Sequence, residues 1–372
     1  MQDCIGIIIG GKSTDRFSSL CKTRPAYMLP FAGRYRLIDF TLSNLANNDL
    51  SNVLLYGGGN LRSTLDHIGN GKSWELNRRR NGLIIFPEIK SSIANENTEM
   101  GMFFETLKYF EDSKEEYLYI VDPMAIDKED LTKAYDRMVN ENLDVLLFYV
   151  EQEDSLGKYI GEKKLIFDED KKLNKIGTNL GTEESFPMLI REGFIKKEVF
   201  INMVKKSVEN SDAKTLLEAI SNNMDNLDIG IYKQDSSVEL IRDLKSFYDV
   251  NMKLLNQDFY NKLFYDNGVV LTKSKDEPST SYGENAKINN SLIANGCKID
   301  GYVENSIIFR GVEIKSGAVI KNSILFQNTV IGKEAVVVNT ITDKGAYIKD
   351  EVSIAGSRTA PYVVEKYFVV EK

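Results

Sequence analysis

The sequence predicts an α/β domain with a mainly parallel sheet, followed by a linker and a parallel β-helix. In the first two thirds of the chain, short apolar runs alternate with helical patterns, as in buried parallel strands joined by helices. Near the C-terminus, a motif of Asn, a small hydroxyl residue and aliphatic residues repeats, which is typical of stacked coils. We expect the α/β domain at residues 1–260, the linker at 261–281 and the β-helix at 282–372.

The first strand is expected at residues 5–9, a mostly β-branched apolar run that leads directly into two glycines. Small residues followed by a cation after a strand allow backbone N–H groups to approach phosphate closely. Gly10, Gly11, Thr14 and Arg16 therefore lie in a candidate phosphate-binding turn. An ordinary tight turn explains the two glycines equally well.

Further apolar runs predict the remaining strands of the α/β domain. They lie at residues 53–56, 83–86, 117–121 and 143–150. Between them, Phe103, Leu107 and Phe110 have helical spacing. Since ligands of parallel sheets lie beyond the carboxyl ends of the strands, Gly10 falls at the edge where a ligand is expected.

The C-terminal repeat has a constant period. The Asn residues that open the four motifs are Asn290, Asn305, Asn322 and Asn339, spaced 15, 17 and 17 residues apart. Two aliphatic series keep the same period, namely Ile314, Ile331 and Ile348, and Ile320, Val337 and Ile354. A six-residue step within a coil of seventeen predicts a triangular β-helix in which each aliphatic residue stacks on its copy in the next coil.

Composition limits the function. The net charge of −8 argues against nucleic acid as a partner, and no apolar stretch is long enough to span a membrane. Three scattered cysteines suggest reduced thiols in a cytoplasmic protein and show no metal spacing. With a single histidine, His67, there is almost no room for a histidine-based triad or metal site.

The stretch from Gly10 to Phe40 closely resembles the opening of the sugar-phosphate nucleotidyltransferases, in particular the ADP-glucose pyrophosphorylase (glucose-1-phosphate adenylyltransferase) family. The matching residues are Gly10, Gly11, Thr14, Arg24, Phe31, Gly33, Tyr35, Arg36, Ile38, Asp39 and Phe40. Arg16 matches with a shift, and the resemblance implies that Gly10, Gly11, Thr14 and Arg16 form a vestigial nucleotide-binding site. The segment with His67 and Trp74 is also similar to the family, and we interpret both residues as packing residues. The resemblance covers essentially the whole chain and implies a Rossmann-like nucleotidyltransferase domain with a C-terminal left-handed parallel β-helix.

The departures from the family pattern fall on its chemical residues. The resemblance places Ala26 where the family has its catalytic lysine and Leu240 where it has its second metal aspartate. An aliphatic side chain cannot ligate magnesium, which requires oxygen, and Asp243 is the obvious candidate to replace it. Asp122 matches the first metal aspartate, although a carboxylate after a strand is also a common cap or turn former. We therefore expect no intact catalytic set and no bound metal.

This pattern resembles the non-catalytic D-type subunit of some bacterial glycogen pathways. The resemblance implies a regulatory role in a heterotetramer with a catalytic ADP-glucose pyrophosphorylase subunit, with Mg²⁺ only in that partner. The first alternative is an active sugar-phosphate nucleotidyltransferase whose metal ligands have moved. The second, an acyltransferase that uses the β-helix, is disfavoured because residues 281–372 contain no histidine.

A second candidate site is an anion site formed by Arg24, Arg34 and Arg36, together with Lys344. Guanidinium groups offer forked donors suited to phosphate oxygens. The resemblance implies a regulatory use, because the family places sugar-phosphate effectors where the first domain meets the β-helix. The alternative is that these cations serve surface solubility or pair with Asp39.

Overall fold

The computed structural model describes residues 1, 3–10, 15–79, 81–89, 98–170 and 172–371. The chain divides into two compact units, each assembled from separate stretches of sequence. The first unit comprises Met1–Gly10, Asn44–Gly58 and Asn70–Val238, and the second comprises Gly11–Ser43, Gly59–Gly69 and Glu239–Lys372. Among the described residues, no helix is both long and apolar enough to span a bilayer.

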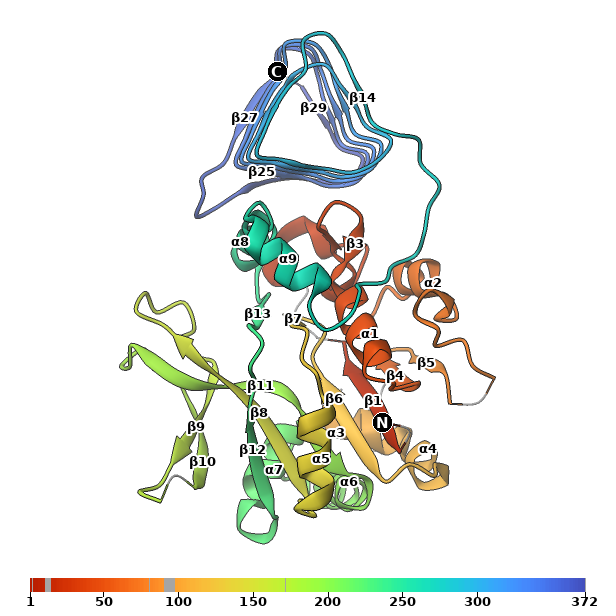
Figure 1. The fold of residues 1–372 in the computed structure, drawn as a ribbon, viewed down its shortest axis with the longest axis vertical. Helices are drawn as coiled ribbons and strands as arrows, with labels where there is room; N and C mark the ends of the chain where they lie inside the picture. The colour runs from red at the N-terminus through yellow and green to blue at the C-terminus, as the bar shows by residue number, and fades with distance from the viewer. Residues whose placement is uncertain (2, 11–14, 80, 90–97, 171, 372) are drawn as a thin grey trace. The chain divides into compact units, whose positions relative to one another are not determined.

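The first unit is built on a mixed sheet (Figure 1). Its strands are β1 (Cys4–Ile9), β4 (Asn52–Tyr56), β5 (Leu83–Phe86), β6 (Tyr117–Val121), β8 (Val145–Glu153), β9 (Lys163–Phe167), β10 (Leu173–Thr178), β11 (Ser185–Lys196) and β12 (Ile229–Lys233), and a short strand β7 (Ala125–Ile126) follows β6. The order is β10-β9-β11-β6-β1-β4-β5, and β8 pairs with both β11 and β12. Strands β1, β4, β5 and β6 run parallel, whereas β11 runs antiparallel to β6, β8 and β9. The expected strands are confirmed at β1, β4, β5, β6 and β8.

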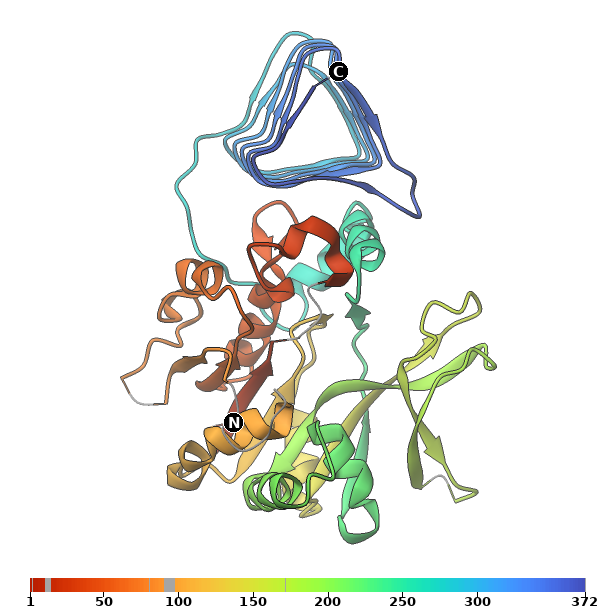
Figure 2. The same ribbon diagram turned by 180° about the vertical axis from the view of Figure 1, so that it is seen from behind.

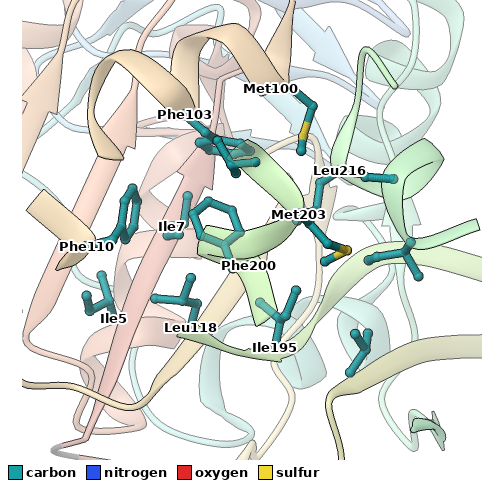
Figure 3. Packing of buried hydrophobic residues seen from close by; sticks show 14 of the residues in the cluster. Ile5, Ile7, Met100, Phe103, Phe110, Leu118, Ile195, Phe200, Met203 and Leu216 are labelled. Atoms are coloured by element: carbon teal, nitrogen blue, oxygen red, sulfur yellow. The ribbon is translucent and has the colours of Figure 1, made fainter. Parts of the chain in front are cut away.

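Helices cover both faces of this sheet. They are α3 (Glu99–Glu105), α4 (Leu107–Asp112), α5 (Thr132–Asn140), α6 (Lys197–Asn210) and α7 (Leu216–Asn222), with short 3-10 helices at Lys72–Trp74 and Met224–Asn226. On one face, Phe103 and Phe110 contact Phe200 of α6 with ring centroids 5.0 and 4.9 Å apart, beside Ile7 and Leu118 of the sheet (Figure 3). On the other face, Tyr135 of α5 packs against Tyr117 and Phe194. Because successive side chains of a strand point to opposite faces, β6 and β11 each contribute to both layers.

The second unit combines an N-terminal segment with the C-terminal third of the chain. Its elements before the β-helix are 3-10 helices at Asp15–Cys21 and Ala26–Met28, β2 (Pro30–Phe31), β3 (Tyr35–Arg36), α2 (Arg62–Ile68), β13 (Glu239–Leu240), α8 (Leu244–Lys253) and α9 (Gln257–Tyr265). Helix α1 (Leu37–Asn47) begins in this unit and ends in the first. Helix α9 extends into the expected linker as far as Tyr265, and the chain then has no helix or strand until Ser281.

The β-helix has the triangular cross-section that the repeat predicts (Figures 1 and 2). Its three faces consist of β14 (Ser281–Tyr282), β17 (Lys298–Ile299), β20 (Glu313–Ile314), β23 (Val330–Ile331), β26 (Tyr347–Ile348) and β29 (Val369–Val370); of β15 (Lys287–Asn289), β18 (Tyr302–Glu304), β21 (Val319–Lys321), β24 (Val336–Val338) and β27 (Ser353–Ala355); and of β16 (Leu292–Ile293), β19 (Ile307–Ile308), β22 (Ile324–Leu325), β25 (Thr340–Thr342) and β28 (Tyr362–Val364). Within each face neighbouring strands are parallel, and Ile314 pairs with Ile331, which pairs with Ile348. The two aliphatic series are thus confirmed as stacked core positions.

The Asn-Ser repeat has a local physical cause. Asn290, Asn305, Asn322 and Asn339 adopt left-handed backbone conformations with φ between 41° and 46°, which asparagine tolerates better than most residues. The following hydroxyl residue points inward, and its Oγ accepts a hydrogen bond from the backbone N–H of the equivalent residue one coil later. Ser323 N donates to Ser306 Oγ at 3.1 Å and Thr340 N to Ser323 Oγ at 3.2 Å. The repeated hydroxyls therefore form a ladder inside one corner of the β-helix.

Candidate functional site

A small pocket lies between the sheet of the first unit and helix α7, beside the carboxyl ends of β1 and β6. Its volume is about 60 Å³, and most of its wall consists of aliphatic residues from the sheet and from α7. Gly10 closes β1 at this edge, where its N–H donates to Tyr56 O at 2.8 Å. Asp122 follows β6 and contributes a carboxylate to the wall. This is the edge of the sheet at which the sequence predicts a ligand.

The charged wall of the pocket is an arginine shared between two carboxylates. Arg191 Nη2 donates to Glu99 Oε2 at 3.1 Å, and Arg191 Nη1 lies 3.5 Å from Asp122 Oδ2. Burial would lower the pKa of Arg191, but Asp122 and Glu99 raise it above its ordinary value. Burial also raises the pKa of Asp122, and the guanidinium opposes that rise. The guanidinium thus favours the charged form of Asp122, and the two carboxylates favour the charged form of Arg191.

A bulge in β11 explains how Arg191 reaches this position. In the pairing with β8, Leu189 lies opposite Tyr149, and the next pair is Gly193 with Leu147, so extra residues are accommodated between the two. Bulges re-aim side chains and are common near functional sites. Gly193 permits the close approach of the two backbones, because a Cβ there would lie 2.4 Å from Leu146 O.

The neighbouring residue, Glu192, also lines the pocket and belongs to a second group of buried polar side chains. Tyr119 Oη donates to Glu192 Oε2 at 3.1 Å, and Glu192 is only 3% exposed. Gln234 donates to Asp127 through its side-chain amide. Burial raises the pKa of Asp127 to about 7 and raises that of Glu192 well above its ordinary value, with a further contribution from Asp127. In both cases burial favours the neutral, protonated form of the carboxyl group.

The two positions at which the family has a catalytic lysine and a metal aspartate carry apolar side chains in this chain. Ala26 is buried in the 3-10 helix after Pro25, and Leu240 ends the short strand β13. Asp243, proposed above as a replacement metal ligand, instead caps α8, since its Oδ1 accepts from Ser246 N at 2.7 Å and from Ser246 Oγ at 2.8 Å. Although burial opposes the change, these bonds lower the pKa of Asp243. Asp243 has a structural role here.

The divalent metal that the family implies does not fit the residues present. Magnesium requires several oxygen ligands in near-octahedral geometry. Asp122 already faces the guanidinium of Arg191, and the described residues contain no group of three or more His, Cys, Asp or Glu side chains placed to hold a metal. The described residues of this chain therefore do not fit a catalytic magnesium ion.

The remaining predicted nucleotide-binding residues are only partly described. Gly11 and Thr14 lie outside the described residues. Arg16 lies exposed in the second unit, where its charge helps to lower the pKa of Asp243.

His67 and Trp74 are packed within the fold. His67 Nε2 lies 2.6 Å from Asp39 Oδ1, and Asp39 also accepts from Arg36 N and Thr272 Oγ1. Trp74 is fully buried in the first unit. Asp39, in the first turn of α1, thus connects this helix with His67 and Thr272.

The four predicted anion-site cations lie in one electropositive region of the second unit. Burial and the charge of Arg24 lower the pKa of Arg36 to about 10. Two further cations, Lys275 and Arg310, were not identified from the sequence, and they interact electrostatically with the predicted ones. The pKa of Lys275 is lowered by burial and then by Lys344, Arg310 and Arg36, and that of Arg310 by burial and then by Arg34. Crowded cations of this kind favour a bound anion.

Within this region, Arg24 is held by a carboxylate that was not predicted. Its Nη2 donates to Asp343 Oδ1 and Oδ2 at 2.8 and 3.0 Å, and the two side chains are 6% and 2% exposed. Its Nη1 is buried without a hydrogen-bond partner among the described residues. Arg34 stacks on Tyr35, with its guanidinium carbon 4.9 Å from the ring centroid. Arg36 Nη1 donates to Met28 O at 2.7 Å.

The sequence contained one usable signal for the residues that were missed. Arg191 and Glu192 interrupt an otherwise apolar strand immediately before a glycine, a pattern that indicates a bulge with functional side chains. The partners Glu99 and Asp343 lacked such a signal, because their contacts are distant in sequence.

Comparison with known proteins agrees with the fold. Residues 5–158 match the nucleotidyl transferase family, and residues 278–370 match the GlmU-like C-terminal hexapeptide family. The fold thus defines a nucleotidyltransferase-type α/β protein with a C-terminal left-handed β-helix. The chain is 32% identical to the glycogen biosynthesis protein GlgD of Bacillus subtilis (strain 168) over 368 residues, covering 98% of this chain and 96% of the relative.

Two further relatives have similar coverage. Identity is 30% to the glycogen biosynthesis protein GlgD of Geobacillus stearothermophilus, over 85% of this chain and 82% of the relative. It is 27% to the glucose-1-phosphate adenylyltransferase of Bacillus mycoides (strain KBAB4), over 86% of each chain. This chain belongs to the GlgD family, which is related to the glucose-1-phosphate adenylyltransferases.

Proposed function

We propose that this chain is a catalytically impaired, regulatory subunit of glucose-1-phosphate adenylyltransferase in glycogen biosynthesis and that it modulates a catalytic partner subunit. The observation that carries the proposal is the ion pair of Asp122 with Arg191. The family resemblance matches Asp122 with one of the two metal carboxylates, and in this chain Asp122 faces a protein cation, Arg191.

The physical argument concerns charge. Adenylyl transfer requires cations on the phosphates and a metal held by carboxylates. Ala26 supplies no ammonium group and Leu240 no oxygen ligand. Loss of a single preorganised contact typically lowers the rate by about 10²–10³-fold, and losses of cooperating groups do not simply add. We therefore expect the chain alone to make little or no ADP-glucose.

The experiment compares the chain, its catalytic homologue and their mixture. We expect the mixture to sediment as a hetero-oligomer, a heterotetramer in our proposal, with ADP-glucose synthesis that differs from that of the homologue alone. The chain alone should turn over at least about 10²-fold more slowly than the homologue. Comparable turnover, with contamination excluded, would favour the alternative of an active sugar-phosphate nucleotidyltransferase. Independent sedimentation at micromolar concentration would contradict the partnership.

We further propose that a small sugar-phosphate effector binds at Arg24, Arg34, Arg36 and Lys344, together with Lys275 and Arg310. The crowding that lowers the pKa values of Arg36, Lys275 and Arg310 supports this, because an anion would relieve it. The unpartnered Nη1 of Arg24 offers a further donor. The carboxylate of Asp343 competes for the same arginine.

Variants of Arg36 and Arg310 test the effector site, and Arg24 is left unchanged because it pairs with the buried carboxylate of Asp343. Arg36→Ala and Arg310→Ala should weaken hexose-phosphate binding roughly tenfold or more, as expected for loss of a charge-assisted hydrogen bond. Arg62→Ala is the matched control, because Arg62 is 94% exposed and pairs only loosely with Asp66. An unchanged effector response of the mixed enzyme in both variants would discard the effector site while leaving the subunit role intact.

The remaining proposals follow from the same function. The chain needs no cofactor of its own, Mg²⁺ acts in the catalytic partner, and the protein works in the cytoplasm. Neither nucleic acid nor a membrane is proposed as a partner. The net charge of −8 and the scattered cysteines support these proposals.

A further inference from the structure

The pocket of the first unit contains a cation supplied by the chain itself. Asp122 follows β6, Glu99 is the first residue of α3, and Arg191 lies in the bulge of β11. Antiparallel pairing of β6 with β11 places Gly193 opposite Ile120, and continuing this register brings Arg191 opposite Asp122. Three elements distant in sequence therefore bring one cation and two carboxylates to the same wall.

Each carboxylate is positioned so that one oxygen is held by the backbone and the other faces the guanidinium. Glu99 Oε1 accepts from Leu216 N at 3.1 Å, and Asp122 Oδ1 accepts from Met124 N at 2.9 Å. The remaining oxygens, Glu99 Oε2 and Asp122 Oδ2, lie 3.1 and 3.5 Å from Arg191. The guanidinium thus occupies the place where a cation between the two carboxylates would lie.

We infer that Arg191 is a resident cation that replaces the divalent metal beside Asp122 and excludes metal from this pocket. The inference deepens the proposed function, on which its biological meaning rests, because it identifies a residue that maintains the loss of metal chemistry. A planar guanidinium matches carboxylates through its forked donors. A divalent ion in the same place would have to displace it or accept a cation in contact.

The same arrangement leaves no positive charge for a phosphate group. Among the described residues that line the pocket, Arg191 is the only cation. Glu99 and Asp122 together outweigh its charge, and Glu99 is only 6% exposed. Without Arg191, two largely buried carboxylates would face each other and would need a counter-ion.

Binding of Mn²⁺ alone to the purified full-length chain tests the inference, with free Mn²⁺ measured by electron paramagnetic resonance. We expect no Mn²⁺ at this site in the wild type, and at least about a tenfold higher affinity in Arg191→Gln, which frees both carboxylates as ligands. The double variant Arg191→Gln with Asp122→Asn should lose that gain. Arg137→Gln is the matched control, since Arg137 is a half-exposed arginine of the same unit that pairs with Glu141, and it should resemble the wild type.

A stability measurement supplies a second readout. Mn²⁺ should raise the Tm of Arg191→Gln and leave that of the wild type and of Arg137→Gln unchanged, because a ligand stabilises only the state that binds it. Mn²⁺ binding to the wild type that disappears in Asp122→Asn would overturn the inference. So would a folded Arg191→Gln variant that neither binds Mn²⁺ nor gains stability from it.

If Arg191→Gln does not fold, the triple variant that adds Glu99→Gln and Asp122→Asn shows whether the two unpaired carboxylates are the cause. Recovery of folding supports a resident cation, and failure to recover overturns it. All of these measurements use this chain alone. A chain that modulates its partner but binds Mn²⁺ at Asp122 would refute only this inference, whereas a metal-free chain without effect on its partner would refute only the proposed function.

Discussion

Two arginines, one in each compact unit, face carboxylates in different ways. Arg24 of the second unit is almost fully buried, and its Nη2 alone donates to both oxygens of one carboxylate, Asp343. Arg191 of the first unit is half exposed and is shared between Glu99 and Asp122. The first arrangement balances one charge against one, and the second places one cation against two anions.

The two arrangements indicate different roles. Arg24 stabilises the fold, whereas Arg191 occupies a place in the pocket where another cation could bind. A fully desolvated one-to-one pair is costly to break, because the surviving partner remains as an uncompensated buried charge. A partly exposed cation between two carboxylates is screened by water, so its removal costs less and leaves a place that other cations can fill. Arg24 thus mainly holds the N-terminal segment to the β-helix within its unit, and Arg191 mainly determines what the pocket accepts.

The largest effect is expected when the buried pair is broken. Asp343→Ala should lower the free energy of unfolding of the second unit by about 3–5 kcal/mol, because it leaves the Arg24 guanidinium buried and unpaired. Urea unfolding measures the loss. The matched control is Arg24→Met with Asp343→Leu, which removes both charges and should retain most of the stability. Equal losses in the single and double variants would contradict the assignment of this pair.

The comparison also shows what the sequence reveals. The β-helix was predicted to the level of stacked residues, because its contacts repeat with the chain: Ile331 meets its own copies, Ile314 and Ile348. Local patterns likewise located β1, β4 and β6. The pairing of β11 with β6 and β8, which determines what Arg191 in the bulge contacts, depends on long-range register that no local pattern specifies.

The candidate site shows the same limit. The positions of Ala26 and Leu240 followed from the family resemblance, and Asp122 was identified with its role in doubt. Its partner Arg191 was missed, as was Asp343, the partner of Arg24, because an ion pair between distant residues leaves no trace in composition or spacing. The sequence therefore predicts which family groups are replaced, and the contacts of Arg191 come only from the structure.

A smaller effect is expected in the hydroxyl ladder of the β-helix, where a buried polar contact is neutral. Ser323→Ala should cost about 1–3 kcal/mol, because it leaves the buried N–H of Thr340 without its acceptor. Ser291→Ala is the control at the less buried end of the same ladder, where water can replace the hydroxyl. Urea midpoints of the two variants decide. A Ser291 variant as destabilised as the Ser323 variant would mean that burial does not govern the ladder.

A still smaller effect concerns the dependence of stability on pH, which involves the buried carboxyl groups of Asp127 and Glu192. Burial raises the pKa of Asp127 to about 7, so near neutral pH the folded state holds a proton that the unfolded state releases. Stability from this group is therefore present at low pH and lost as pH rises, by on the order of 1 kcal/mol between pH 6 and 8. The raised pKa of Glu192 acts in the same direction.

Urea unfolding at both pH values tests this behaviour. Asp127→Asn should flatten the dependence of stability on pH, because the asparagine does not titrate. Asp130→Asn is the control in the same segment, since Asp130 is exposed and hydrogen bonds to Thr132 lower its pKa. It should leave the slope between pH 6 and 8 unchanged. An Asp127 variant with the slope of the wild type would refute the role of this carboxyl group.

The smallest effect is expected for an exposed pair that links the same segments as Arg24 and Asp343. Lys22 Nζ lies 2.6 Å from Glu365 Oε1, but the two side chains are 62% and 50% exposed. Water screens the attraction and holding two long side chains costs entropy, so Lys22→Ala should lower stability by less than about 1 kcal/mol. The loss should shrink further at 1 M NaCl, where the Debye length falls to about 3 Å. A loss comparable to that of Asp343→Ala, or one insensitive to salt, would show that exposure does not distinguish the two pairs.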